Sequence, residues 1–293
     1  MITKADRLMI DTIYNILDNG FKDENPRPKY ADGTPAHTIS VNHTYRQYNL
    51  DRGEFPICTL RPIAWKTGIK EIFTIYQKPT NNIAEMRARG VTWWDEWDIG
   101  DGTIGQRYGA TVERYDLVER LINNIKNDPY GRRKIISLWQ ETDLRETPGL
   151  APCAFQTIWN VRGKYLDMLL VQRSGDMLTA SGPGGINEIQ YAAFLMMIAR
   201  HTGYEPGVFS HVVANEQIYD RHMDAANQML SRFSARDREE FVEWVEDETT
   251  RQLSQPRLVL NPEKTNFFEM TIDDFTMENY DPIKPQLKLE LGI

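Results

Sequence analysis

The sequence predicts an α+β fold in which helices pack against one mixed sheet within a single domain. Helical and strand-like segments alternate without the regular strand–helix–strand order of a parallel α/β fold. The 293 residues, 41% of them hydrophobic and 26% charged, are enough for one substantial core. Because no internal repeat or low-complexity linker divides the chain, we expect one domain over residues 1–293.

The N-terminal half begins with a pattern that is typical of an amphipathic helix. Apolar residues recur at helical spacing from Met9 to Leu17, and Asn19-Gly20 follows as a stop signal. Residues 21–37 are rich in Pro, Gly, Asp and Lys, which predicts a loop. A partly alternating stretch and a further helical stretch come next, so we expect a strand over 38–50 and a helix over 66–77.

The second half contains three strand-like stretches between helical ones. Apolar residues at helical spacing precede the breaker Asn127-Asp128-Pro129, and the turn Arg162-Gly163-Lys164 predicts a hairpin. A long apolar helix ends at Gly203. We expect helices over 116–126, 187–201 and 232–254, the last a charged surface insertion, strands over 134–139, 155–161 and 165–173, and further strands in the C-terminal third.

The composition excludes several classes of protein. The net charge of −8 argues against a dedicated nucleic-acid binder and gives no attraction to anionic membranes. Cys58 and Cys153 are too few for a disulfide framework or a four-cysteine zinc site, and none of the five histidines has metal-ligand spacing. The N-terminus lacks the apolar core of an export signal, and the longest apolar run, 192–199, is too short to span a bilayer. We therefore expect a cytoplasmic protein without a metal, a membrane or an obligate nucleic-acid partner.

Cys153 is the strongest candidate for chemistry. It lies in Ala151-Pro152-Cys153-Ala154-Phe155, where a predicted loop meets a strand. A free cysteine is usually a small buried hydrophobe, so the residue alone predicts a core position more often than catalysis. Arg173, at the end of the next predicted strand, shifts the balance because a guanidinium beside a thiol favours the thiolate. Arg173 could equally bind a phosphate through two parallel hydrogen bonds.

Four other motifs have both an ordinary and a functional interpretation. Arg132-Arg133, in a turn before a strand, is either a solvated pair or a phosphate clamp. Glu71, among apolar neighbours, is either exposed at a helix edge or buried for acid–base chemistry. The tryptophans of Thr92-Trp93-Trp94-Asp95-Glu96-Trp97 are ordinary core or surface aromatics, or a wall for a flat cofactor. Ser181-Gly182-Pro183-Gly184-Gly185 is a turn, or a set of N–H groups for an anion.

A set of short motifs spread over nearly the whole chain resembles the thymidylate synthase family. The motif at residues 32–38 resembles the bacterial and phage branch of that family. Each motif is weak alone, whereas the ordered set, with twenty residues from Cys153 to Arg173, is highly specific. The motifs are Asp32-Gly33-Thr34-Pro35-Ala36-His37-Thr38, Trp94-Asp95-Glu96-Trp97, Gly105-Gln106-Arg107-Tyr108-Gly109, Arg132-Arg133, Pro152-Cys153, Gln172-Arg173-Ser174 with Asp176, Asn187, and Ile218-Tyr219 with His222.

The resemblance implies reductive methylation of dUMP to dTMP. Cys153 would attack C6 of the uracil ring, and Tyr108 would help to remove the C5 proton. Glu71 would organise water for proton transfers at O4 and for release of the folate nitrogen. Asn187 would read the pyrimidine edge, because an amide accepts from N3–H and donates to O4, which fits uracil.

The resemblance also implies the binding partners. The co-substrate 5,10-methylenetetrahydrofolate would supply the methylene group and the hydride, in a site that closes to exclude water. The enzyme would be a homodimer packed sheet to sheet, and its clustered arginines would also lower the pKa of the thiol. The phosphate would be held by Arg27, Arg173 and Ser174, together with Arg132 and Arg133 of the other subunit. The rest of the nucleotide site would be formed by Gln172, Gln217 and Tyr219, with Tyr219 on the sugar 3′-OH. The folate site would be formed by Trp94, Trp97, Asp176 and the tail ending in Ile293.

The chain departs from the family pattern at three places. Gln217 replaces a common histidine two residues before Tyr219, and glutamine can hydrogen-bond a sugar hydroxyl but cannot carry a proton. The segment between Asp176 and Asn187 looks longer than usual, and Ala154 replaces the common histidine after the cysteine.

These departures leave alternatives open. A deoxypyrimidylate hydroxymethylase of the same family, acting on dUMP or dCMP, would capture the methylene with water, although Trp94, expected to shield that group, favours the synthase. A non-catalytic nucleotide- or RNA-binding regulator is a second alternative, against which the net charge and the intact set of Cys153, Arg173, Asn187 and Glu71 argue. A cysteine hydrolase would need a histidine base that the sequence does not locate near Cys153.

Overall fold

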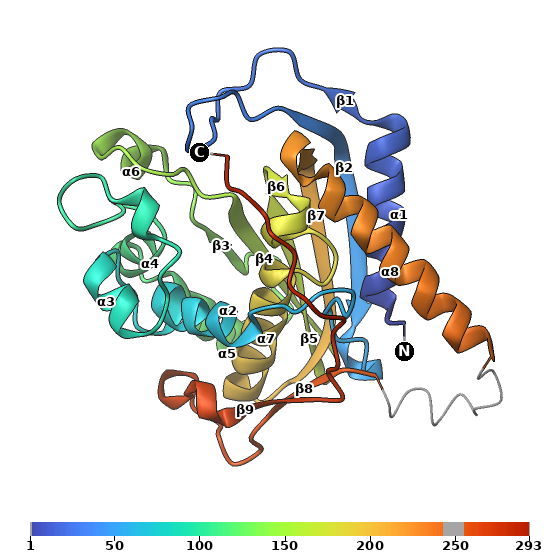
Figure 1. Cartoon of the computed structure of the whole chain (residues 1–293). Helices are drawn as coiled ribbons and strands as arrows, with labels where there is room; N and C mark the ends of the chain where they lie inside the picture. The colour runs from blue at the N-terminus through green and yellow to red at the C-terminus, as the bar shows by residue number, and fades with distance from the viewer. Residues whose placement is uncertain (1, 243–254, 293) are drawn as a thin grey trace.

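The computed structural model describes residues 2–242 and 255–292, and its main feature is one mixed sheet with helices packed against it (Figure 1). The strand order is β1-β2-β7-β5-β4-β3, and β6 pairs with the end of β7. Pairing is antiparallel except for β5 and β6, which both run parallel to β7. The α+β prediction is confirmed. The strands are β1 (Phe21–Lys22), β2 (Thr38–Asn49), β3 (Ile135–Ser137), β4 (Ala154–Arg162), β5 (Tyr165–Gln172), β6 (Gly175–Asp176) and β7 (Glu205–Tyr219), with a separate antiparallel pair of β8 (Arg257–Leu260) and β9 (Phe275–Glu278).

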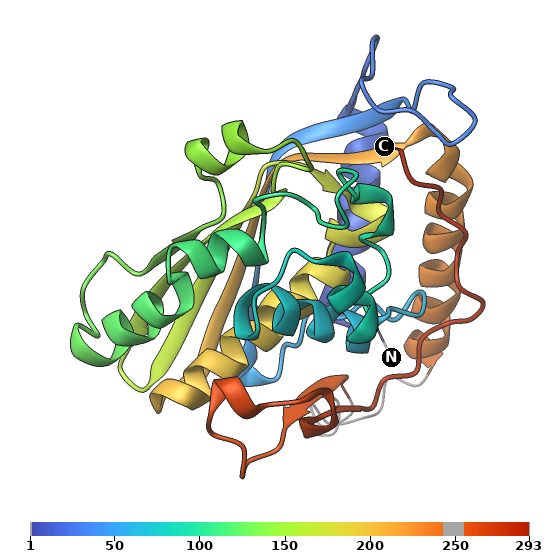
Figure 2. The ribbon, with the colours of Figure 1, turned by 90° about the vertical axis from the view of Figure 1, so that its left-hand side faces the viewer.

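Helix α7 (Ile186–Thr202) lies at the centre of the core. Its sequence is apolar on all sides, which explains why it lies buried between the sheet and α2 (Trp65–Ile72) rather than on the surface (Figure 2). Gly203 ends the helix with a φ of 82°, a conformation that glycine adopts without strain. At its other end, the first turn of α7 lies next to the end of β5. This brings Asn187 beside Gln172.

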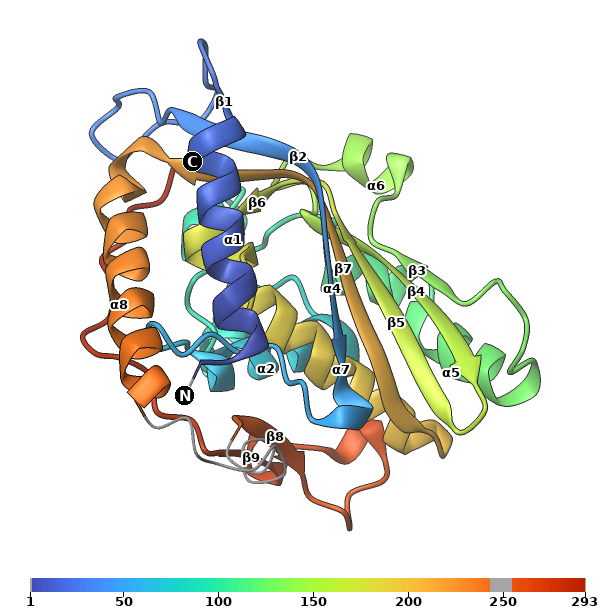
Figure 3. The ribbon, with the colours of Figure 1, turned by 90° about the vertical axis from the view of Figure 1, so that its right-hand side faces the viewer.

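The remaining helices surround this core. Helix α1 (Lys4–Asn19) begins with a capping box between Thr3 and Asp6 and packs its apolar face on β2. Figure 3 shows α1 and α8 (Met223–Val242) side by side. The other helices are α3 (Ile83–Ala88), α4 (Gly109–Arg114), α5 (Leu117–Asn127) and α6 (Glu141–Glu146). Within the described ranges, no helix is both long and apolar enough to cross a membrane.

The two faces of the sheet have different surroundings. Along β5 alternate residues from Leu166 to Gln172 are buried on the α7 side, whereas Leu169 and Val171 on the other face are only half-buried. Tyr45 of β2, 59% exposed, lies on that second face beside Ser210. The sheet therefore presents an accessible, largely apolar face that the described helices do not cover.

Most predicted elements are confirmed, with the differences at element ends. The strand expected over 134–139 is reduced to β3, and the loop over 21–37 includes the short β1. The helix expected over 66–77 is α2 followed by a wider π-helical turn, Phe73–Gln77, whose last side chain donates to the carbonyls of Phe267 and Met270. The helix expected from residue 232 already begins at Met223 in α8, and residues 243–254 of that expectation lie outside the described residues.

Candidate active site

A cavity of about 600 Å³ opens between the ends of β4 and β5, the first turn of α7, and α2. The C-terminal tail crosses the molecule to reach it, and Leu291 and Gly292 form part of its wall (Figure 1). Histidine is absent from the described lining, so no histidine base faces Cys153 as a cysteine hydrolase would need. Thirteen of the predicted site residues line the cavity: Arg27, Glu71, Trp94, Trp97, Tyr108, Cys153, Gln172, Arg173, Ser174, Asp176, Asn187, Gln217 and Tyr219.

Cys153 is half-buried in the last loop position before β4. Its sulfur lies 3.4 Å from a guanidinium nitrogen of Arg173, and its backbone N–H donates to the hydroxyl of Tyr108 at 3.4 Å. Burial raises the pKa of the thiol, and the charge of Arg173 opposes that rise. The expected lowering by a guanidinium is present for Arg173, and in the single chain burial outweighs it.

Arg173 also holds the backbone that carries the cysteine. Its Nε donates to the carbonyl of Pro152 at 3.0 Å, and an Nη atom donates to the carbonyl of Ala151 at 2.8 Å. Its own N–H donates to the carbonyl of Cys153 at 2.9 Å, which continues the β4–β5 ladder past the last paired residues. The thiol and the guanidinium are thus fixed relative to each other by the sheet.

Glu71 is buried, so the structure decides between its two interpretations. One carboxylate oxygen accepts the indole N–H of Trp93 at 2.7 Å and that of Trp94, and the other accepts the amide of Gln190. Burial raises the pKa of Glu71, and these three hydrogen bonds oppose the rise. A buried carboxyl with a raised pKa at a cavity wall is suited to exchange protons with a bound group.

Asn187 lies in the first turn of α7, with its amide in the cavity wall. Its Oδ1 accepts from the amide of Gln172 at 3.4 Å, and its Nδ2 donates to Gln190 at 3.0 Å. The long segment before it folds as a π-helical turn, Met177–Ser181, followed by the glycine-rich loop. Gly184 packs there against Cys58, where an added Cβ would lie 2.3 Å from a backbone nitrogen. Although the segment between Asp176 and Asn187 is long, Asn187 still lines the cavity.

Tyr108 connects the thiol to the aromatic wall of the site. Its ring packs edge-on against Trp94 with 4.7 Å between the centroids. The residue has a φ of 48°, which is strained for an aromatic side chain and is most often seen at functional sites. Trp97 is half-buried further along the same wall.

Two further predicted site residues, Gln217 and Tyr219, lie at the end of β7. Burial raises the pKa of Tyr219 to about 12, so its hydroxyl keeps its proton and can donate a hydrogen bond. Gln217 precedes it on the same face of the strand, and Asp176 lies 3.7 Å from the ring of His222. The tail reaches this corner, since a Cβ on Gly292 would lie 2.7 Å from the ring of Tyr219.

Three predicted site residues are not part of this cavity as described. Arg132 and Arg133 are exposed in the turn before β3 and do not line it. Ile293 lies outside the described residues. Arg27, by contrast, is exposed at the mouth of the cavity.

Sequence reasoning missed two partners of Glu71. The pattern around Trp93 indicates an aromatic wall but no bond to a carboxylate, and Gln190 stands in no recognised motif. Gln190 lies three residues after Asn187 on one helix, a spacing that brings two side chains to the same face. That spacing was the signal available for it.

Comparisons with known proteins agree with one another. The family model described as thymidylate synthase matches residues 8–293. The thymidylate synthase of Lactococcus lactis subsp. lactis is 46% identical over 299 residues and that of Streptococcus pneumoniae is 44% identical, and both alignments cover 100% of each chain. Among solved structures, thermostable thymidylate synthase A from Bacillus subtilis superimposes with a TM-score of 0.84 at 33% identity, covering 99% of this chain and 100% of that one.

Proposed function

The chain belongs to the thymidylate synthase family of methyltransferases, and from this premise we propose that it methylates dUMP to dTMP with 5,10-methylenetetrahydrofolate as co-substrate. The observation that carries the proposal is the position of the Cys153 sulfur, in one cavity with Arg173, Asn187 and Glu71. Residues 1–293 would form a single catalytic domain.

Cys153 is the proposed nucleophile toward C6 of the uracil ring. Its thiol must lose a proton to attack, and Arg173 is the cation that favours the thiolate against burial. Bond formation at C6 moves an electron pair toward O4 and makes C5 nucleophilic. Tyr108, whose hydroxyl lies beside the Cys153 backbone, would later assist removal of the C5 proton.

Asn187 and Glu71 are proposed to act at the edge of the ring that carries N3 and O4. The amide of Asn187 would accept from N3–H and donate to O4. Glu71, with its pKa raised by burial, would organise a water that delivers and removes protons at O4. The amide of Gln190 joins the two, since it contacts both side chains.

The phosphate and sugar would bind at the mouth of the cavity. Arg27, Arg173 and Ser174 line that side, and Gln217 and Tyr219 lie where a sugar hydroxyl would reach. Clustered guanidinium groups suit a phosphate dianion.

Arg132 and Arg133 would complete the phosphate site of a partner subunit. Both are exposed and do not line the cavity of their own chain, as such a role requires. The uncovered sheet face, with Tyr45 and the half-buried Leu169 and Val171, is apolar enough to pack against a second copy in a sheet-to-sheet homodimer.

The residues present fit a folate. Trp97, Ile75 and Leu150 offer an apolar and aromatic wall for a flat ring, and the carboxylate of Asp176 offers an acceptor for ring N–H groups. When bound, the folate supplies the one-carbon unit and the hydride. The tail at Leu291 and Gly292 would close over it and exclude water.

Tritium release from dUMP labelled at C5 tests the proposed nucleophile. With methylenetetrahydrofolate present, the wild type should release tritium into water, and Cys153→Ala should lower the rate by on the order of a thousandfold or more. Cys58→Ala is the matched control, because Cys58 is fully buried outside the cavity. Release by Cys153→Ala at the rate of the control would overturn the role given to Cys153.

A further inference from the structure

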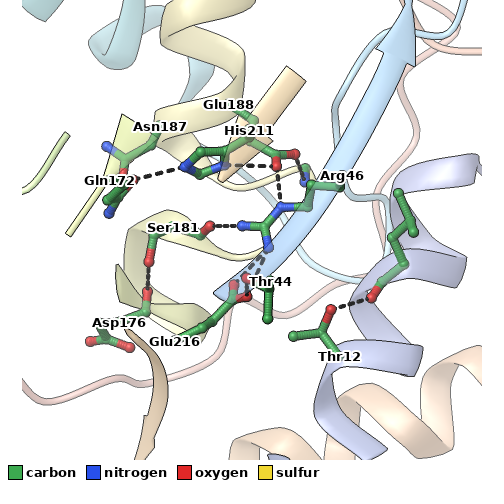
Figure 4. A network of polar contacts seen from close by, with 12 residues as sticks. Thr12, Thr44, Arg46, Gln172, Asp176, Ser181, Asn187, Glu188, His211 and Glu216 are labelled. Atoms are coloured by element: carbon green, nitrogen blue, oxygen red, sulfur yellow. Dashed lines mark hydrogen bonds and ion pairs between the residues drawn. The ribbon is translucent and has the colours of Figure 1, made fainter. Parts of the chain in front are cut away.

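A continuous chain of hydrogen bonds runs from the buried interior of the sheet to the cavity. It starts at a histidine that is fully buried on β7 and ends at the carboxylate of Glu71 in the cavity wall. Each link is a side-chain contact, and Figure 4 shows the first three members, His211, Gln172 and Asn187. In order, the members are His211, Gln172, Asn187, Gln190 and Glu71.

His211 faces acceptors on both sides of its ring. Its Nδ1 lies 3.0 Å from a carboxylate oxygen of Glu188, and its Nε2 lies 3.1 Å from Oε1 of Gln172 (Figure 4). Glu188 is held in place by Arg46 and by the backbone N–H of Gly184 at 2.7 Å. The ring can satisfy both neighbours only by donating from both nitrogens.

Charged groups of both signs surround His211. Arg46 pairs with two buried carboxylates, Glu188 and Glu216, which leaves one excess negative charge in the cluster. Burial and the charge of Arg46 lower the pKa of His211, and Glu188 and Glu216 oppose that shift. The proton on Nε2 is therefore assigned from the two acceptors that the ring faces.

The orientation of the Gln172 amide is fixed by two neighbours. Its Nε2 donates to the backbone carbonyl of Ser174 at 2.9 Å, and a backbone carbonyl cannot become a donor. Its Oε1 accepts from His211 on the opposite side. Gln172 therefore presents N–H, and not oxygen, to Oδ1 of Asn187.

The other end of the chain has the same direction. Nδ2 of Asn187 donates to Oε1 of Gln190, and Nε2 of Gln190 donates to Glu71. Glu71 accepts from Trp93 and Trp94 as well, so its ionised form is an acceptor on every side. Gln190 is 2% exposed, and its amide is held between Asn187 and Glu71.

We propose that His211 and Gln190 are positioning residues that hold the Asn187 amide in the orientation that recognises uracil and rejects cytosine. In this orientation Asn187 has one lone pair left on Oδ1 for a ring N–H and one hydrogen left on Nδ2 for a ring carbonyl. Cytosine presents the reverse pattern, a ring nitrogen acceptor and an amino donor. Binding it would invert Asn187 and turn the amides of Gln172 and Gln190 against fixed acceptors. This inference rests on the proposed role of Asn187 in reading the base.

Equilibrium binding of dUMP and of dCMP to the full-length chain tests the inference without depending on turnover. The wild type should prefer dUMP. His211→Leu keeps a side chain of similar bulk but removes the N–H to Gln172, and it should reduce the preference for dUMP over dCMP about tenfold. His211→Gln can present an N–H near the former Nε2 and should restore most of the preference. Loss of packing alone would lower both affinities together.

Gln190→Leu interrupts the same series of hydrogen bonds near Glu71. It tests the inference if His211→Leu does not fold. Gln77→Leu is the matched control, since Gln77 is also a buried glutamine but bonds to backbone carbonyls outside the cavity. The preference should fall in Gln190→Leu and stay at the wild-type level in Gln77→Leu. Wild-type preference in both His211→Leu and Gln190→Leu, or equal loss in His211→Leu and His211→Gln, would overturn the inference. A wild type that does not prefer dUMP would instead show that the proposed substrate is wrong, and the inference would fall with it.

Discussion

The guanidinium of Arg173 lies 3.4 Å from the sulfur of Cys153 although the residues are twenty positions apart in the chain. The antiparallel pairing of β4 with β5 explains the proximity, because Ala154 and Gln172 are register partners at the end of the hairpin. The same guanidinium donates to the carbonyls of Ala151 and Pro152. One arginine therefore both shapes the loop that carries the thiol and supplies the positive charge nearest to it.

Removing that charge should make the thiol a weaker acid. Arg173 lowers the pKa of Cys153 against burial, so Arg173→Leu should move the thiol pKa further upward. The thiolate is the species that reacts with iodoacetamide. In a Cys58→Ala background, the midpoint of the pH profile of Cys153 alkylation should shift to higher pH. Arg162→Leu, which removes an exposed arginine paired with Asp167, is the control and should leave the midpoint unchanged. A midpoint that stays in place in Arg173→Leu would contradict the electrostatic role.

Trp93 should tune the proton affinity of Glu71. Its indole N–H donates to the carboxylate at 2.7 Å and is the largest of the influences that lower the pKa of Glu71. Trp93→Phe keeps a ring but removes the donor, so the pKa that Glu71 contributes to the pH dependence of kcat should rise. Trp97→Phe removes another cavity tryptophan without a hydrogen bond to Glu71 and should leave that pKa unchanged. Equal shifts in both variants would indicate a general change in the cavity wall.

Mixed dimers should reveal whether Arg132 and Arg133 serve the partner's site. The Cys153→Ala chain lacks a nucleophile, and an Arg132→Ala/Arg133→Ala chain would lack the phosphate ligands it gives to its partner. Each alone should be nearly inactive. After the two are unfolded and refolded together, half the dimers should be mixed, each with one intact site, so about a quarter of the wild-type activity should return. No recovery on mixing would contradict the shared site.

Gly184 should contribute to stability as well as to the hydrogen bonding of Glu188. It has a φ of 67°, and an added Cβ would lie 2.3 Å from the backbone nitrogen of Cys58. Gly184→Ala should lower the free energy of unfolding by about 3 kcal/mol or more, from backbone strain plus this clash. Gly33→Ala is the control, because Gly33 has a φ of 82° with no atom near its Cβ position, and it should cost about 1 kcal/mol. Urea denaturation measures both, and equal losses would mean that the loop moves to accept the methyl group.

The sequence predicts local elements well where an apolar stretch is bounded by clear stop or turn signals. Helix α7, which ends at Gly203, and the β4–β5 hairpin have that property. The long strand β7 was anticipated only in general terms, because His211 and Glu216 interrupt its apolar alternation at buried positions. Their burial is compensated by Arg46 on β2, the register partner of His211, and such a pairing between distant segments is invisible in a single pattern.

The candidate site shows the same limit. Ordered motifs brought Cys153 and Arg173 together correctly, but they could not decide whether Glu71 is buried. Its three donors are 22, 23 and 119 residues away in the chain, so only the folded structure brings them to one carboxylate. The degree of burial of Cys153, which raises the thiol pKa against the effect of Arg173, likewise depends on packing that the sequence does not display.

The identity of the products tests the central claim most directly. The purified chain is incubated with dUMP and 5,10-methylenetetrahydrofolate, and the nucleotide and the folate are both identified. If hydride completes the transfer begun by Cys153, dTMP and dihydrofolate should form in equal amounts. Formation of 5-hydroxymethyl-dUMP together with tetrahydrofolate would contradict the account, because water rather than hydride would then have captured the carbon.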